Sequence, residues 1–187
     1  MIIYFKIDFK INFKQSQKKS IKMILAIDVH YRENIAKVVA VLFNWEDETP
    51  QDTIVEQITG IEEYVPGEFY KRELPCIESI VKKVNLNNIE AIIIDGHIYV
   101  DNNGEFGLGG YTWKSLNEKI PIIGVAKTSF FRNKNTVREV FRGESIKPLY
   151  ISSIGIDLYI AINKVKNMHG NFRIPTILKE LDRITKE

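Results

Sequence analysis

Three acidic residues, Asp28, Glu73 and Asp95, lie beside apolar segments that are far apart in the sequence. Asp28 ends the run ILAID, Asp95 ends the run AIIID, and Glu73 precedes the apolar positions of LPCIESIV. Carboxylates repel one another at close range unless a cation lies between them. Their oxygens are the ligands that Mg²⁺ and Mn²⁺ prefer. If the fold gathers these residues, the sequence predicts a divalent-metal site that acts on phosphate.

Each acid also has a simpler structural interpretation. Asp28 could cap the turn that follows its strand, and Asp95 could be an ordinary turn residue before Gly96. Glu73 could favour the positive end of a helix dipole at the start of its helix. In open α/β sheets, however, binding sites gather at the carboxyl ends of strands. Two acids at such ends therefore favour a shared site.

Three further residues carry reactive groups. Lys127 ends the run IIGVAK and could contact a scissile phosphate, or it could be a solvated lysine at a strand end. His97, two residues after Asp95, could orient water, contact phosphate or cap its loop. Cys76 lies in an apolar helical stretch, so we expect a buried small side chain and not a nucleophile. A single cysteine excludes an internal disulfide framework and indicates a reducing, cytoplasmic location.

The pattern of apolar residues predicts an α/β domain. Three strands with short connections, at residues 23–29, 35–43 and 53–59, predict an antiparallel start to a mixed sheet. Helices and buried strands then alternate, as expected when the later strands are parallel. Their predicted ranges are a helix at 72–84 with Pro75 near its first turn, a strand at 91–94, a helix at 111–119, a strand at 120–125, an edge strand at 148–152, and helices at 158–168 and 176–184.

Composition limits the class of protein. Hydrophobic residues make up 44% and charged residues 27% of the 187 residues, which is typical of a soluble domain without a membrane span. Residues 1–22 carry six lysines and one aspartate, and we expect a disordered or misassigned N-terminal extension, or a basic arm, before a domain at 23–187. Without them, the net charge changes from +2 to −3. Metal ions and a local basic track would then have to offset the acidic site if the domain binds nucleic acid.

Six short motifs follow one another along the chain. They are Asp28 and Tyr31 in IDVHY, YVPG at 64–67 followed by YKRE at 70–73, Asp95-Gly96 after AIII, GVAK at 124–127, KPLYIS at 147–152, and Pro175-Thr176 followed by Glu180. In this order, on compatible elements, they resemble the motifs of the endonuclease V family. The resemblance runs from about Met23 to the C-terminus.

The resemblance implies an RNase H-like fold and a monomeric Mg²⁺-dependent endonuclease, with Mn²⁺ as a substitute. Its substrate would be DNA or RNA that contains a modified base, inosine (deaminated adenine), and it would hydrolyse a phosphodiester bond nearby in DNA repair or RNA processing. The implied catalytic residues are Asp28, Glu73, Asp95 and Lys127, and the implied metal ligands are the same three acids with Glu180 as a weaker fourth. The implied substrate-binding residues are Tyr64, Val65, Pro66 and Gly67, as a wedge beside the base, together with His97.

The chain departs from the family motifs where the base would be read. The loop after Asp95-Gly96 is longer and acidic, Lys71 replaces a phenylalanine, and Ile177 replaces an arginine. The carboxylates are kept, so metal-dependent cleavage is better supported than inosine specificity. Two alternatives stay open: a catalytically altered nucleic-acid-binding relative of the same fold, and a metal-dependent phosphohydrolase of small substrates.

Overall fold

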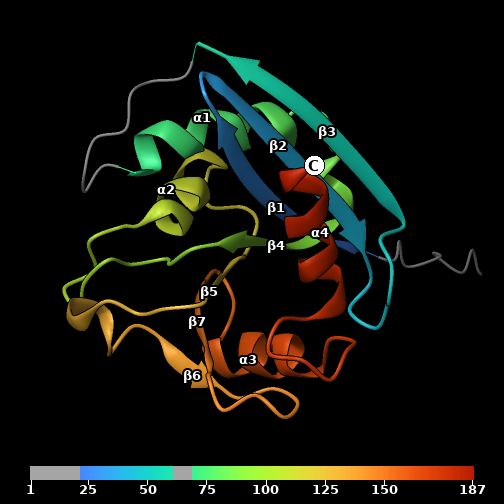
Figure 1. Ribbon diagram of the computed structural model, residues 1–187. Coiled ribbons are helices and arrows are strands. Elements are labelled where there is room, and N and C mark those ends of the chain that lie inside the picture. Colours follow the sequence, from blue (N-terminus) through green and yellow to red (C-terminus); the bar gives the residue numbers. More distant parts are fainter. Residues whose placement is uncertain (1–21, 61–68) are drawn as a thin grey trace, which may run out of the picture.

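The computed structural model describes residues 22–60 and 69–187, which form a seven-stranded sheet with helices on both faces (Figure 1). The strands lie in the order β3-β2-β1-β4-β5-β7-β6. In chain order the elements are β1 (Met23–Arg32), β2 (Ile35–Phe43), β3 (Asp52–Thr59), α1 (Phe69–Val81), the 3₁₀ turn η1 (Leu86–Asn88), β4 (Ile89–Asp95), α2 (Leu108–Ser115), β5 (Ile122–Ala126), the 3₁₀ turn η2 (Phe131–Asn133), β6 (Arg138–Val140), β7 (Leu149–Ile154), α3 (Leu158–Asn167) and α4 (Thr176–Lys186).

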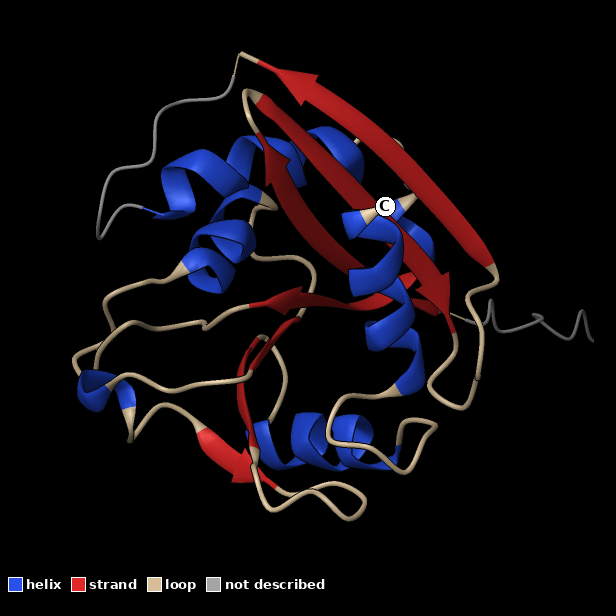
Figure 2. Cartoon of the chain, viewed as in Figure 1, coloured by secondary structure: helices blue, strands red, loops and turns tan. Residues whose placement is uncertain are grey.

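Helices lie on both faces of the sheet (Figure 2), and a hydrophobic cluster fills the space on each face. On one face Leu25 of β1 packs in a cluster with Ile80 of α1 and residues of α2. On the other face Ile24 of β1 packs in a cluster with Leu181 of α4 and residues of α3. Because both faces of β1 are covered, its first half is apolar at every position.

The predicted antiparallel start is confirmed. Strand β2 pairs antiparallel with both β1 and β3, and β1 then pairs in parallel with β4, as β4 does with β5. Strands β7 and β6 close the sheet in antiparallel pairings. The predicted mixed α/β sheet is therefore present.

The parallel strands end together at one edge of the sheet. The pairing of β1 with β4 ends at Ile27 and Ile94, so Asp28 and Asp95 take equivalent positions just beyond it. Strand β5 ends beside Asp95, and Lys127 follows it directly. The topology thus brings three predicted site residues to one place.

Two predicted elements differ from the structure. Residues 149–154 form β7, which lies between β5 and β6 and is not an edge strand. Pro148 precedes this strand, so it removes no N–H from the ladder. The edge is β6, whose three residues are too few to show a period in the sequence. Helix α2 spans Leu108–Ser115, earlier than the predicted 111–119.

Two other predictions concern the burial of Cys76 and the presence of membrane-spanning helices. Cys76 is buried in α1, as expected. Within the described ranges, no helix is both long enough and apolar enough to cross a membrane. The predicted extension at residues 1–22 lies outside the described residues, except for Lys22.

Candidate active site

Asp28 and Asp95 lie at neighbouring ends of β1 and β4, and both resist ionisation. Burial raises the pKa of Asp28, and a hydrogen bond with Thr185 of α4 offsets only part of that effect. Burial also raises the pKa of Asp95, and repulsion from Asp28 adds to it, while Lys127 opposes it. Carboxyl groups held where their charge is unfavourable are typical of functional sites.

Glu73 reaches the same place from α1. Its side chain is 7% exposed. Burial raises the pKa of Glu73 to about 9, and repulsion from Asp28 and Asp95 contributes to the rise. Glu73 is therefore protonated at neutral pH unless a cation draws near.

Helix α1 starts earlier than predicted, which changes the environment of Glu73. The helix begins at Phe69, so Glu73 lies in its interior and does not open it. Pro75, predicted in the first turn, also lies inside the helix. The guanidinium carbon of Arg72 stacks 3.7 Å from the ring centroid of Tyr31 on β1, which holds α1 against the strand that carries Asp28.

Lys127 and Asp182 complete the acidic cluster. The Nζ atom of Lys127 lies 3.7 Å from Oδ1 of Asp182 on α4, and Lys186 Nζ lies 2.7 Å from Oδ2 of the same residue. Burial would raise the pKa of Asp182, but these lysines outweigh it, so its pKa is lowered. Asp182 stays ionised beside Asp28 and Asp95 and lines a small cavity of about 70 Å³ with them.

Glu180, the predicted fourth acid, does not join this cluster. Its carboxylate pairs with Arg183 at 2.6 Å, and the hydrogen bonds with Arg183 lower its pKa. Positions 180 and 182 are about 200° apart around a helix. The buried stripe of Ile177 and Leu181 fixes the orientation of α4, and this orientation turns Asp182 toward the sheet edge. Helical phase was the signal in the sequence that could have identified Asp182.

Two arginines that the sequence analysis missed hold this arrangement in place. Arg173 donates to the backbone carbonyls of Lys127 and Pro148 and so links the start of α4 to the end of β5. Arg142 is buried and donates to carbonyl groups at the end of α3 and in the loop that follows it. Bonds from side chains to carbonyl groups leave no periodic pattern, which explains why sequence reasoning could not find them.

A cavity of about 960 Å³ opens beside the acidic cluster, and Asp28, Glu73, Asp95 and Lys127 line it. Its wall includes a pair of stacked tyrosines, Tyr70 of α1 and Tyr111 of α2, with ring centroids 3.8 Å apart. A cavity of this size with an aromatic wall suits a planar ring system, such as a nucleobase.

His97 lies on the wall of this cavity, as its predicted role requires. Its Nε2 atom donates to the carbonyl oxygen of Thr128, 2.9 Å away, and burial lowers the pKa of His97. The neighbouring backbone is tightly packed: a Cβ atom at Gly124 would lie 2.5 Å from the carbonyl oxygen of Gly96. The predicted wedge residues Tyr64, Val65, Pro66 and Gly67 lie outside the described residues.

The four carboxyl groups suit a divalent cation by their chemistry. Asp28, Glu73, Asp95 and Asp182 offer only hard oxygen ligands, and a nearby positive charge would offset the burial and the repulsion that raise the pKa of the first three. Within residues 22–60 and 69–187, no three acidic, histidine or cysteine side chains stand close enough to share an ion as positioned. Holding an ion therefore requires these side chains to turn toward it.

Glu73 should make the metal-free protein less stable at high pH. Its folded pKa of about 9 exceeds the ordinary 4.5, so between these values the folded state keeps a proton that the unfolded chain releases. The free energy of unfolding therefore falls as pH rises through this window. In EDTA, Glu73→Gln should raise Tm at about pH 8.5 by about 5 °C and change it little near pH 5. Thermal unfolding at several pH values measures this.

Glu180→Gln is the matched control, because the pKa of Glu180 is lowered and this group does not titrate in that window. An unchanged dependence of Tm on pH in Glu73→Gln would contradict the account of this residue.

Comparison with known proteins places the chain among characterised sequences. A family model described as Endonuclease V matches residues 6–145. The endonuclease V of Pyrococcus horikoshii is 26% identical over 168 residues, which cover 89% of this chain and 74% of the relative.

Solved structures have the same fold. The endonuclease V structure from Bacillus subtilis superposes with a TM-score of 0.75 at 20% identity, and covers 89% of this chain and 80% of that chain. Endonuclease V from Ciona intestinalis, in complex with a 24mer DNA that contains an inosine followed by a ribo-adenosine, gives a TM-score of 0.74 at 16% identity, with 88% and 84% covered. These likenesses confirm the predicted RNase H-like fold.

Proposed function

The chain belongs to the endonuclease V family, since the family model matches well over half of it, and on this premise we propose that it is a divalent-metal-dependent endonuclease that cleaves nucleic acid near inosine. The observation that carries this proposal is the convergence of Asp28, Glu73 and Asp95, each with a raised pKa, beside Lys127 at the rim of one cavity. Maintaining such a cluster costs stability, which a functional role would explain.

The four carboxyl groups would hold Mg²⁺, or Mn²⁺ in its place. A bound ion would supply a more acidic water and neutralise charge on the phosphate. Lys127 is exposed toward the cavity, and its ammonium can neutralise a phosphate oxygen while Asp182 holds it in position. Asp28 and Asp95 lie at the ends of two rigid strands, which would hold their carboxyl groups in fixed positions around the ion.

The cavity supports a substrate larger than a simple phosphate. The stacked pair of Tyr70 and Tyr111 offers a flat wall to a base, and His97 lines the same space. A relative has been solved with DNA that contains inosine, which supports the choice of base. A displaced base would leave its phosphates near the acidic edge, where the carboxyl groups and Lys127 lie.

Cleavage of end-labelled strands tests this function. In Mg²⁺, we expect DNA or RNA strands with a single inosine to be cut at least about tenfold faster than strands with adenosine at that position. Equal cutting rates for the inosine and adenosine strands would contradict the proposed specificity for inosine. Tight binding without cutting would favour the catalytically altered relative, and release of phosphate from mononucleotides would favour the small-substrate phosphohydrolase.

A further inference from the structure

The turn between β5 and β6 exposes two adjacent phenylalanines among cations. Phe130 is 50% exposed and Phe131 is 84% exposed. The Nζ atom of Lys134 lies 4.9 Å from the ring centroid of Phe131, and Arg132 follows Phe131 directly in the sequence. Single exposed apolar side chains are common, but neighbouring aromatic rings beside cations are typical of surfaces that bind nucleic acid strands.

This turn is held rigidly despite its exposure. Asn133, at its centre, is fully buried. Its Oδ1 atom accepts from the N–H of Phe130 at 2.9 Å, and its Nδ2 atom donates to the carbonyl of Tyr99 at 3.1 Å. The N–H of Asn135 donates to Oδ1 of Asn102 at 2.8 Å, which ties the turn to the loop after β4. The backbone that carries the exposed rings is therefore pre-organised, which lowers the entropic cost of binding a ligand.

The turn is continuous with the candidate active site. Phe130 and Arg132 line the same cavity of about 960 Å³ as Asp95 and Lys127. The ring centroid of Phe130 lies 5.1 Å from that of His97, which also lines the cavity, and Phe131 follows Phe130 directly in the chain. In Figure 1 the η2 turn lies at the outer end of the loops that follow β4 and β5. A strand that leaves the cavity on this side would pass over the turn.

We propose that the turn at residues 130–134 is a stacking platform for the unpaired strand next to the cleaved bond. One base would stack on Phe131, while Lys134 and Arg132 approach its phosphates. Arg132 also lies 3.9 Å from Asp101, so part of its charge is already balanced. In a duplex the faces of a base are covered by its neighbours, so an exposed ring of this kind selects single-stranded or frayed nucleic acid. The inference rests on the proposed function, since it names the form of substrate for that site.

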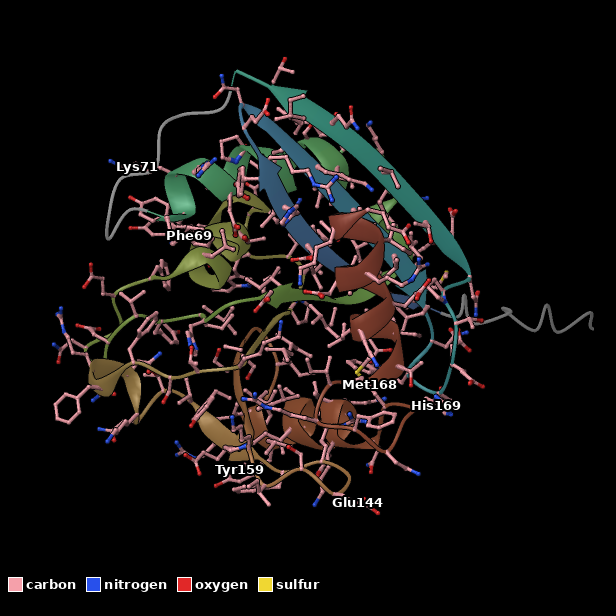
Figure 3. All side chains as sticks on the ribbon, in the orientation of Figure 1. Phe69, Lys71, Glu144, Tyr159, Met168 and His169 are labelled. Atoms are coloured by element: carbon pink, nitrogen blue, oxygen red, sulfur yellow. The ribbon has the colours of Figure 1, made fainter. Side chains whose placement is uncertain are left out.

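Binding of a fluorescein-labelled, inosine-containing strand, measured by anisotropy in EDTA, tests the platform. Phe131→Ala should weaken binding of the single strand by about tenfold, and Phe131→Trp should restore it. The same strand annealed into a duplex should lose less than about twofold, because no free base face meets the ring. Tyr159→Ala is the matched control: Tyr159 is 68% exposed on α3, and Figure 3 shows it far from Phe69, which lines the cavity.

The outcomes separate this inference from the function on which it rests. Unchanged single-strand affinity in Phe131→Ala would overturn the platform, and so would equal losses for single strand and duplex. If the wild-type protein binds the strand with the expected dependence on Phe131 but cuts nothing in any divalent metal, the platform stands and the nuclease function fails. If the wild-type protein cuts and Phe131→Ala has the same KM, the platform alone fails.

Discussion

Replacing Asp28 or Asp95 with asparagine should lower the cleavage rate at least about 1,000-fold, equivalent to about 4 kcal/mol of barrier. Asparagine keeps the shape of aspartate but cannot supply the negative charge that a divalent cation requires. Single-turnover cleavage of an inosine-containing strand measures the loss. Retention of more than about a tenth of the rate in either variant would contradict the assigned role.

The same substitutions should not damage the fold. Burial raises the pKa of Asp28 and Asp95, so a neutral side chain at either position removes an unfavourable charge at neutral pH. We therefore expect Tm in EDTA to stay the same or to rise. Lost activity with a lowered Tm would instead indicate a structural role for these carboxyl groups.

Helix α4 offers a test variant at Asp182 and a matched control at Glu180. Asp182→Asn should lower the rate at least about 10- to 100-fold, because the metal site loses one carboxylate and Lys127 loses the partner that positions it. It should also lower Tm slightly, since ion pairs with Lys127 and Lys186 stabilise the charged form of Asp182. Glu180→Gln makes the equivalent acid-to-amide change on the opposite side of the helix, and should leave the rate within about twofold.

The sequence alone is sufficient to predict the site residues that lie at strand ends. An apolar run that ends in an acid, as at Asp28 and Asp95, marks a buried strand whose last side chain can leave the core. The parallel pairing of β1 with β4, which makes these two positions adjacent, depends on contacts between distant segments and has no local signal. The order of the family motifs predicts that Asp28 and Asp95 share a site, which the periodicity of apolar residues cannot do.

The helical contributions were harder to predict. The spacing of apolar residues, with Pro75 near a first turn, predicts that Glu73 opens its helix, yet α1 begins at Phe69 and contains Pro75 in its interior. Motif spacing favoured Glu180, whereas the phase of the buried stripe on α4 selects Asp182. Motif spacing takes no account of which face of the helix is buried, and here burial decides the position of the carboxylate.

Cleavage should also require a divalent cation. Without one, no ion activates a water or neutralises the phosphate, Asp28, Glu73 and Asp95 ionise only at a cost, and Asp182 is already paired with lysines. Lys127 alone cannot take the place of the ion, because it is already paired with Asp182. We therefore expect metal removal to have an effect as large as the loss of Asp28 or Asp95.

The most direct test is the single-turnover rate of cutting an end-labelled, inosine-containing strand by the wild-type protein, first in EDTA and then across a series of Mg²⁺ concentrations. The account predicts a rate in EDTA at least about 1,000-fold below that in saturating Mg²⁺, with a saturable rise between them and the same pattern with Mn²⁺. Cutting in EDTA at the rate seen in Mg²⁺ would contradict the central claim that the carboxyl groups of β1, α1, β4 and α4 act by holding a metal ion.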